Sequence, residues 1–123
     1  MEFSIAHADD RFELSLAGKA MPSDYDKLLD TLTTHQKWQP GSPVLSDETN
    51  LETAHLGSAD ITKVANICEK YRDAIGKAKM ATIAQEDLVF GLNRMWEVHV
   101  QDKWMAEVMV FRSRADALDW LAG

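Results

Sequence analysis

The sequence predicts one α/β domain with a mostly parallel sheet, and three observations carry this prediction. The chain has 123 residues, 46% of them hydrophobic, which is the size of a single domain with its own core. Strand and helix patterns alternate along it. Helical patterns of ten or more residues separate the later strands, as parallel neighbours require. We expect about five strands and four helices in the order ββαβαβαβα, within one domain over residues 1–123.

The first third of the chain predicts a β-hairpin and a helix. Apolar residues alternate with polar ones around residues 3–5 and 12–16, on either side of the turn formers Asp9 and Asp10. Residues 22–24 then open a helix whose apolar side chains repeat at helical spacing. These side chains are Tyr25, Leu28, Leu29 and Leu32.

A short strand and a second helix are expected in the middle of the chain. Val44 and Leu45 predict a brief buried strand that ends in the polar cluster of residues 46–50. Ser58 is the expected N-cap of the second helix, with Asp60 favourably placed in its first turn. The apolar stripe of this helix consists of Ile61, Val64, Ala65, Cys68, Tyr71 and Ile75.

The last third predicts two more strands, each followed by a helix. Residues 80–84 form a short apolar strand of the buried kind, and residues 86–104 are expected to form one helix. Residues 108–111 supply the last strand. Ser113 then caps a terminal helix that carries Ala117, Leu118, Trp120 and Leu121.

Charge and cysteine content exclude several classes of function. The net charge of −7 repels phosphate backbones, and the Lys and Arg residues of segment 63–79 are interleaved with acidic ones, so we expect no nucleic-acid partner. The single cysteine, Cys68, cannot form an internal disulfide. No cationic leader opens the chain, and no apolar run approaches the ~20 residues of a membrane span. The expected location is the cytoplasm.

The helix expected over residues 86–104 has more apolar surface than one buried face needs. Its large apolar side chains cover roughly 220° of the helical wheel. Leu88, Leu92 and Met95 form one stripe, and Val89, Phe90, Trp96 and Val100 lie beyond it. A lipid-like ligand, a second copy of the chain, a membrane surface or a neighbouring helix would each cover the excess. The sequence leaves these alternatives open.

Three segments carry a resemblance to a known family. They are Lys37 to Leu45 (KWQPGSPVL), Glu86 to Trp96 (EDLVFGLNRMW) and Val110 to Leu121 (VFRSRADALDWL). With the order of elements, they resemble the bacterial SpoIIAA-like family of STAS/SEC14 domain proteins, over nearly the whole chain. STAS domains and CRAL-TRIO lipid carriers share this architecture. The resemblance implies a binding or regulatory domain rather than a catalyst.

STAS relatives imply one function, in which partner proteins are exchanged on phosphorylation of a serine at the start of the second helix. Ser58 occupies about this place and is the candidate regulatory residue. Those relatives carry Asp-Ser-x-Gly, whereas here no acidic residue precedes Ser58 and the glycine, Gly57, is displaced. As a helix cap, Ser58 would contribute about 1 kcal/mol. Under this alternative the chain is a protein-interaction module or a homodimer.

CRAL-TRIO relatives imply a different function, in which a nonpolar small molecule or lipid lies between helices and sheet. Apolar and aromatic walls with few polar anchors are typical of such pockets. The expected ligand-binding residues come from the second and third helices. They are Val64, Ile67, Cys68, Tyr71, Val89, Phe90, Leu92, Met95 and Trp96. A weak peripheral contact with membranes is a neighbouring hypothesis, because an amphipathic helix with Trp and Phe can lie among lipid headgroups.

Gly91 stands in the middle of the wide apolar helix, where glycine costs about 1 kcal/mol relative to alanine. Two interpretations are open. The backbone approaches the sheet or another helix closely at this point, or the helix bends there as a hinge that opens and closes a cavity.

Catalytic and metal-binding motifs are weak in this sequence. The patterns of a nucleophile elbow, a zinc protease and the glycine-rich phosphate loops are absent. The four histidines show no metal-ligand spacing, so neither a metal nor a cofactor is expected. A hydrolase-like site formed by Asp47, Glu48, His55 and Ser58, acting on a hydrophobic substrate, is the third and least favoured function.

Overall fold

A computed structural model describes the whole chain, residues 1–123, and contains one five-stranded sheet with strand order β1-β2-β3-β4-β5. The first two strands pair antiparallel, and the other neighbours pair parallel. The predicted fold class and order of elements are confirmed, with one short additional helix, α3. The elements are β1 (Glu2–Ala8), β2 (Arg11–Lys19), α1 (Asp24–Thr33), β3 (Val44–Glu52), α2 (Ser58–Glu69), α3 (Arg72–Ile75), β4 (Lys79–Ile83), α4 (Asp87–Val100), β5 (Glu107–Phe111) and α5 (Arg114–Ala122).

The hairpin turn lies where the sequence predicts it. Asp9 and Asp10 have φ angles of 54° and 61°, so both are in the left-handed region. A two-residue turn with this geometry matches the right-handed twist of the strands that it joins, and Asp tolerates it better than most residues do.

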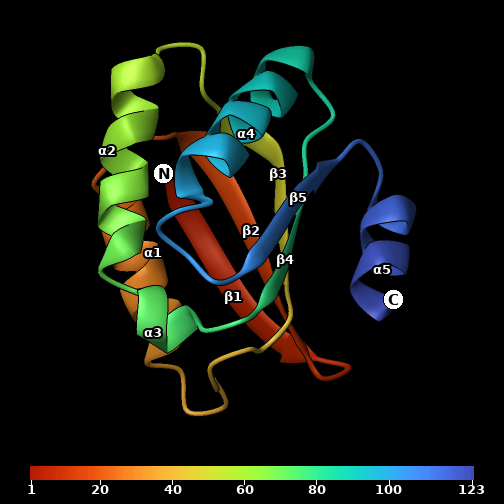
Figure 1. Cartoon of the computed structure of the whole chain (residues 1–123). Coiled ribbons are helices and arrows are strands. Elements are labelled where there is room, and N and C mark those ends of the chain that lie inside the picture. Colours follow the sequence, from red (N-terminus) through yellow and green to blue (C-terminus); the bar gives the residue numbers. More distant parts are fainter.

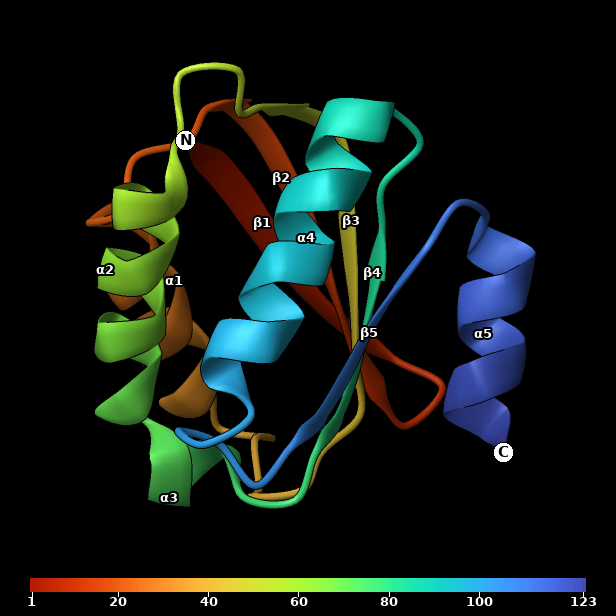
Figure 2. The ribbon, with the colours of Figure 1, turned by 45° about the horizontal axis from the view of Figure 1, so that its top comes forward.

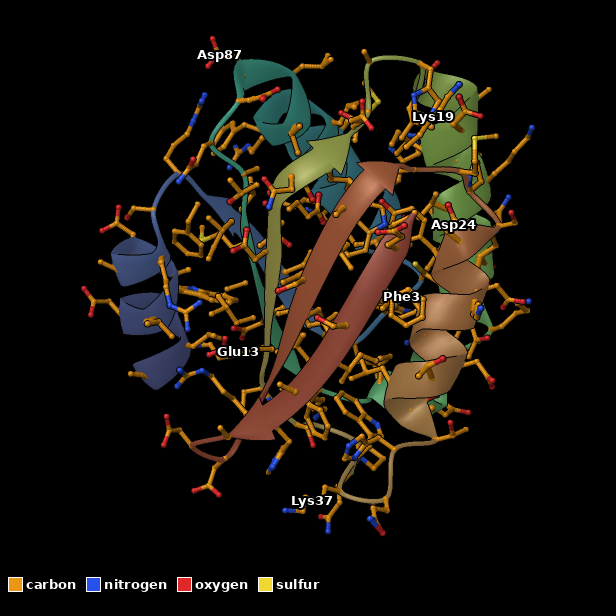
Figure 3. The ribbon with its side chains drawn as sticks, turned by 180° about the vertical axis from the view of Figure 1, so that it is seen from behind. Phe3, Glu13, Lys19, Asp24, Lys37 and Asp87 are labelled. Carbon is orange, nitrogen blue, oxygen red and sulfur yellow. The ribbon has the colours of Figure 1, made fainter.

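Helices cover the two faces of the sheet unequally. α1, α2 and α4 lie over one face, called the front face below, whereas α5 lies on the other side (Figure 1 and Figure 2). Seen from behind, β1 and β2 have no helix over them (Figure 3). The main hydrophobic core therefore lies between the front face and three helices, and a smaller cluster packs beneath α5. No helix has the length and apolarity that a membrane span requires.

β3 is longer than its apolar residues indicate. It runs from Val44 to Glu52, so the prediction of a brief strand that ends in the polar cluster of residues 46–50 is wrong. The neighbouring strand supplies backbone partners along its whole length, from Phe12 opposite Val44 to Lys19 opposite Glu52. Ladder hydrogen bonds satisfy the backbone whatever the side chains are, so polar residues continue the strand.

A β-bulge changes the register between β2 and β3. Two residues of β3, Glu48 and Thr49, stand opposite the single residue Leu16. Asp47 holds the bulge because one oxygen of its carboxylate accepts hydrogen bonds from the Thr49 backbone N–H at 2.9 Å and from the Thr49 hydroxyl at 2.5 Å. Regular alternation from Val44 through Ser46 already places Glu48 on the front face, and the extra residue of the bulge brings Leu51 to that face as well.

The second predicted helix differs from the structure at both ends. Its N-cap is Gly57 rather than Ser58, because the Asp60 carboxylate accepts a hydrogen bond from the Gly57 N–H at 2.9 Å and Ser58 already lies in the first turn. The predicted stripe is also divided between two helices. α2 ends at Glu69, and the separate α3 carries Ile75.

The long apolar helix ends earlier than predicted. α4 ends at Val100 and not at Trp104. The backbone N–H groups of Lys103 and Trp104 both donate to the Val100 carbonyl, at 3.0 Å, in a turn that closes the helix. Trp104 then packs inward, where its indole N–H donates to the Cys68 carbonyl at 2.6 Å.

The stripe of Leu88, Leu92 and Met95 on α4 is not the face that the structure buries. Leu88 and Met95 are 50% and 37% exposed, and only Leu92 of the three is buried. Val89 and Asn93 are buried instead, one helical turn apart on the face toward the sheet. A polar residue therefore stands inside the buried stripe, which apolar periodicity does not indicate.

The structure decides against one of the two interpretations of Gly91. A methyl group added at this position would meet nothing within 4 Å, so the backbone approaches no neighbour closely. The hinge stays a prediction.

Replacing Gly91 with alanine should raise the free energy of unfolding by up to about 1 kcal/mol, because space is open and alanine favours the helix. Gly76 provides the matched control. Its φ is +64°, and an added Cβ would lie 2.9 Å from the Pro40 Cβ, so Gly76→Ala should lower the free energy of unfolding by about 1–2 kcal/mol. Urea denaturation of both variants measures the two effects. A destabilised Gly91→Ala variant would contradict the open helix surface.

Candidate functional site

A cavity of about 80 Å³ lies in the main core, between the front face and α1, α2 and α4. Its walls are mostly hydrophobic, and 13 of its 18 lining residues are apolar or aromatic. Among the lining residues, Tyr25, Leu56 and Trp96 keep some exposure, whereas the others are buried. A concave apolar space with few polar groups is typical of a small-molecule site.

Glu48 brings a carboxyl group into this cavity from the bulge of β3. The side chain is buried, with 8% of its surface exposed. The side-chain amide of Asn93, on α4, donates a hydrogen bond of 2.9 Å to one of its oxygens and a second, of 3.0 Å, to the Val89 carbonyl. The strand and the helix thus meet through a buried polar contact.

Burial raises the pKa of Glu48 to about 7, from an ordinary value of 4.5. Removal from water disfavours the charged form, and the negative charge of Asp47 acts in the same direction. The hydrogen bond from Asn93 lowers the pKa but does not outweigh burial. Glu48 therefore changes its protonation state near neutral pH.

Two further polar atoms of the cavity wall have no hydrogen-bond partner. They are the hydroxyl oxygen of Thr53, just after β3, and the indole Nε1 of Trp96, on α4. The Trp96 indole does interact with the thiol of Cys68, which is only a weak acceptor. Most buried polar groups in proteins are paired, so two orphaned atoms in one small cavity indicate that a ligand or water completes the site.

Tyr25 and Cys68 complete the titratable groups of the cavity. Burial raises the pKa of Tyr25 well above its ordinary value, and the charge of Glu48 adds to this effect. Burial also raises the pKa of the Cys68 thiol to about 12. Both groups stay protonated and neutral at physiological pH, so Glu48 alone changes charge there.

Comparison with known proteins identifies the fold. No protein-family model matches the chain, and no curated protein matches it. Among solved structures, it is similar to an uncharacterized protein of the DUF3478 family with a SpoIIAA-like fold, from Shewanella loihica PV-4. The likeness covers 98% of this chain and 92% of the other, with a TM-score of 0.62 and 24% sequence identity. This chain has a SpoIIAA-like fold.

The SpoIIAA-like arrangement brings together four of the nine residues predicted to bind a ligand. Val64 and Cys68 of α2 line the cavity together with Leu92 and Trp96 of α4. The sequence predicts that these two helices face each other across the site, because apolar side chains repeat at helical spacing on both. The same spacing turns the apolar side of each helix toward the sheet.

The other five predicted residues lie outside the cavity. Tyr71 packs against the core edge, and its hydroxyl donates to the Asp26 carboxylate at 2.7 Å. Phe90 lies under the Arg112 guanidinium, whose central carbon is 4.1 Å from the ring centroid. Val89 belongs to a separate small cluster with Ala84 and Val110. Ile67 is half-buried and Met95 is exposed, and neither lines the cavity.

The residues of the hydrolase hypothesis do not gather at this site. Ser58 is exposed at the start of α2. His55 contacts the Ala20 carbonyl through Nε2, and Asp47 is engaged by Thr49. Only Glu48 of the four lines the cavity. No group of three His, Cys, Asp or Glu side chains is placed to hold a metal ion.

A second, more polar hollow adjoins the cavity. It lies between residues 49–54 and the start of α4, and its lining includes Glu86 and Leu88. Thr53 belongs to the walls of both spaces. Thr53 therefore lies where the cavity and this hollow meet.

Sequence reasoning missed Asn93 and Thr53 as site residues and placed Glu48 in the wrong kind of site. One signal for Asn93 was present, since it follows Val89 by one helical turn within the apolar helix. Glu48 shares the front face with Val44 and Ser46 by regular alternation, but this signal was hidden because the continuation of the strand through polar residues depends on pairing with β2.

Glu48→Gln should remove a pH dependence of stability. The native pKa of about 7 exceeds the unfolded value of about 4.5, so the native state binds the proton more tightly. Stability from this group is present below pH 4.5 and is lost as pH rises to 7. The difference corresponds to about 3 kcal/mol at most. In urea denaturation, the variant should match the unmodified protein at pH 4 and exceed its stability at pH 8.5. Parallel pH profiles would contradict the raised pKa.

Thr53→Val should raise the free energy of unfolding by about 1 kcal/mol, because it removes an unpaired buried hydroxyl at nearly constant shape. Thr49→Val is the matched control. It removes a hydroxyl that donates to Asp47 and should lower stability by a similar amount. A destabilised Thr53→Val variant in urea denaturation would mean that its hydroxyl is satisfied in solution.

Proposed function

We propose that this SpoIIAA-like domain is a non-catalytic binding domain that takes up a small, mostly apolar molecule in the cavity beneath α1, α2 and α4. The observation that carries the proposal is the cavity itself, which is apolar, lies in the main core and holds orphaned polar atoms. Apolar walls supply affinity by excluding water, and a few polar groups supply orientation.

The size of the cavity restricts the ligand. Its volume of about 80 Å³ holds several water molecules, but it is smaller than the ~150 Å³ that accepts benzene in an engineered protein core. Pockets for drug-sized ligands measure roughly 300–1,000 Å³. A molecule of a few heavy atoms fits the closed form best. A long-chain lipid would require α2 and α4 to separate, and bending of α4 at Gly91 is one way to achieve this.

The half-buried residues indicate where such a molecule enters. Trp96 packs edge to face on Trp104, with ring centroids 5.5 Å apart, and forms the part of the wall that reaches the surface on α4. Leu56 reaches the surface from the segment before α2. Movement of these two side chains would open the cavity with little change in the sheet.

A binding role agrees better with the chemistry of the site than catalysis does. General acid–base catalysis usually needs two titratable groups with different pKa values near the substrate. The partner of Glu48 is the amide of Asn93, which does not titrate. The thiol of Cys68 is held protonated by burial and is a poor nucleophile.

Xenon is a suitable first probe because it enters apolar cavities without specific contacts. Under xenon pressure, NMR signals of Val64 and Leu92 should shift in the unmodified protein. The Leu92 signals should not shift in Val64→Phe, in which the larger ring fills the cavity. Ile67→Phe, on the same helix but outside the cavity wall, is the matched control and should behave like the unmodified protein. No shift of cavity signals in any protein would contradict the proposal.

Native mass spectrometry of gently purified protein distinguishes the remaining alternative. A monomer carrying a small added mass supports ligand binding. An empty dimer, or a complex with another protein that Ser58→Asp disrupts, supports interaction through Ser58 and α2 instead.

A further inference from the structure

The unpaired atoms in the cavity are suited to an acceptor oxygen. The indole N–H of Trp96 can only donate a hydrogen bond, and the Thr53 hydroxyl can donate as well as accept. Leaving a buried donor unpaired is unfavourable, so a ligand oxygen that accepts from either group gains affinity that a hydrocarbon of the same shape cannot gain.

Glu48 adds a third donor when it is protonated. Asn93 donates to one of its carboxyl oxygens, which leaves the second oxygen to carry the proton. Because burial raises the pKa of Glu48 to about 7, the neutral and charged forms are both populated near neutral pH. In the neutral form its O–H can donate toward the cavity.

The charges around the cavity disfavour ionic ligands. The titratable groups that line it are Tyr25 from α1, Glu48 from β3 and Cys68 from α2, and α4 contributes the uncharged Asn93 and Trp96. No Lys, Arg or His is among the lining residues, so an anion would meet no positive charge and would be repelled by ionised Glu48. An ammonium ion would pair with Glu48 but would offer no acceptor to Trp96.

We propose that the cavity selects a small uncharged molecule with a carbonyl or ether oxygen on a short or cyclic hydrocarbon body, and that this oxygen accepts hydrogen bonds from Trp96, Thr53 and Glu48. This inference rests on the proposed binding function and specifies its ligand class.

Two probes of nearly equal shape test the role of the oxygen, and because each has six heavy atoms, both require the same widening of the closed cavity by movement of Leu56 and Trp96. Cyclopentanone carries a carbonyl oxygen, and methylenecyclopentane replaces it with a CH₂ group. Each is titrated into ¹⁵N-labelled protein at pH 6 and pH 8.5, and the indole N–H signal of Trp96, assigned with Trp96→Phe, is followed by NMR. Cyclopentanone should bind more tightly than methylenecyclopentane at pH 6. Its affinity should fall about tenfold at pH 8.5, because Glu48 has lost its proton there.

Two variants separate Glu48 from the other titrating groups. Glu48→Gln keeps a donor at every pH, so cyclopentanone should bind it equally well at pH 6 and pH 8.5. Glu52→Gln removes an exposed carboxylate from the same strand and should keep the pH dependence of the unmodified protein. Thr53→Val should weaken cyclopentanone binding severalfold and leave methylenecyclopentane unaffected.

The outcomes distinguish this inference from the proposed function. If both probes bind with equal affinity at both pH values, the cavity binds apolar molecules and water satisfies its polar atoms. In that case the inference fails and the proposed function stands. Preferential binding of cyclopentylammonium at pH 8.5 would also overturn the inference. If neither probe nor xenon shifts cavity signals, both the inference and the proposed function fail.

Discussion

The hydrogen bond between Asn93 and Glu48 is the contact on which the architecture of the site depends. It joins α4 to β3 inside the main core, where water does not compete and an unpaired partner is costly. Its two residues are both polar in surroundings that are otherwise apolar. Each therefore constrains the other, because α4 must present Asn93 to the sheet and the strand must turn Glu48 inward. The cavity lies beside this contact.

The length of β3 makes the contact possible, because alternation from Val44 through Ser46 turns Glu48 to the front face, where a bulge then begins. Regular pleating turns alternate residues to opposite faces, so the inserted residue lets both Glu48 and Leu51 join the front face. Asp47 stabilises the bulge through Thr49 and also raises the pKa of Glu48. Regular alternation thus sets the direction of the Glu48 side chain, and burial, with a smaller contribution from the charge of Asp47, raises its pKa.

The orientation of α4 explains why an apolar helix can leave large hydrophobic side chains in water. Leu88, Met95 and Val98 are 50%, 37% and 65% exposed, because the face that contains Asn93 is turned to the sheet. The excess apolar surface of this helix is covered only in part. Trp96 contacts Trp104, and Phe90 lies beneath Arg112, so both rings are covered within the chain.

The sequence by itself determined the fold class, the hairpin and the order of strands and helices, since these follow from local periodicity and turn residues. It also indicated that α2 and α4 contribute apolar walls, four of whose members line the cavity. It did not determine the length of β3, the buried face of α4 or the inward position of Glu48. Tertiary structure decided these. Pairing with β2 extends the strand through polar residues, and the buried hydrogen bond between Asn93 and Glu48 turns the Asn93 face of α4 toward the sheet in place of the stripe that contains Leu88 and Met95. Backbone pairing and hydrogen bonds between buried polar groups join residues far apart in the chain, such as Glu48 and Asn93. The local sequence pattern carries no information about such pairs.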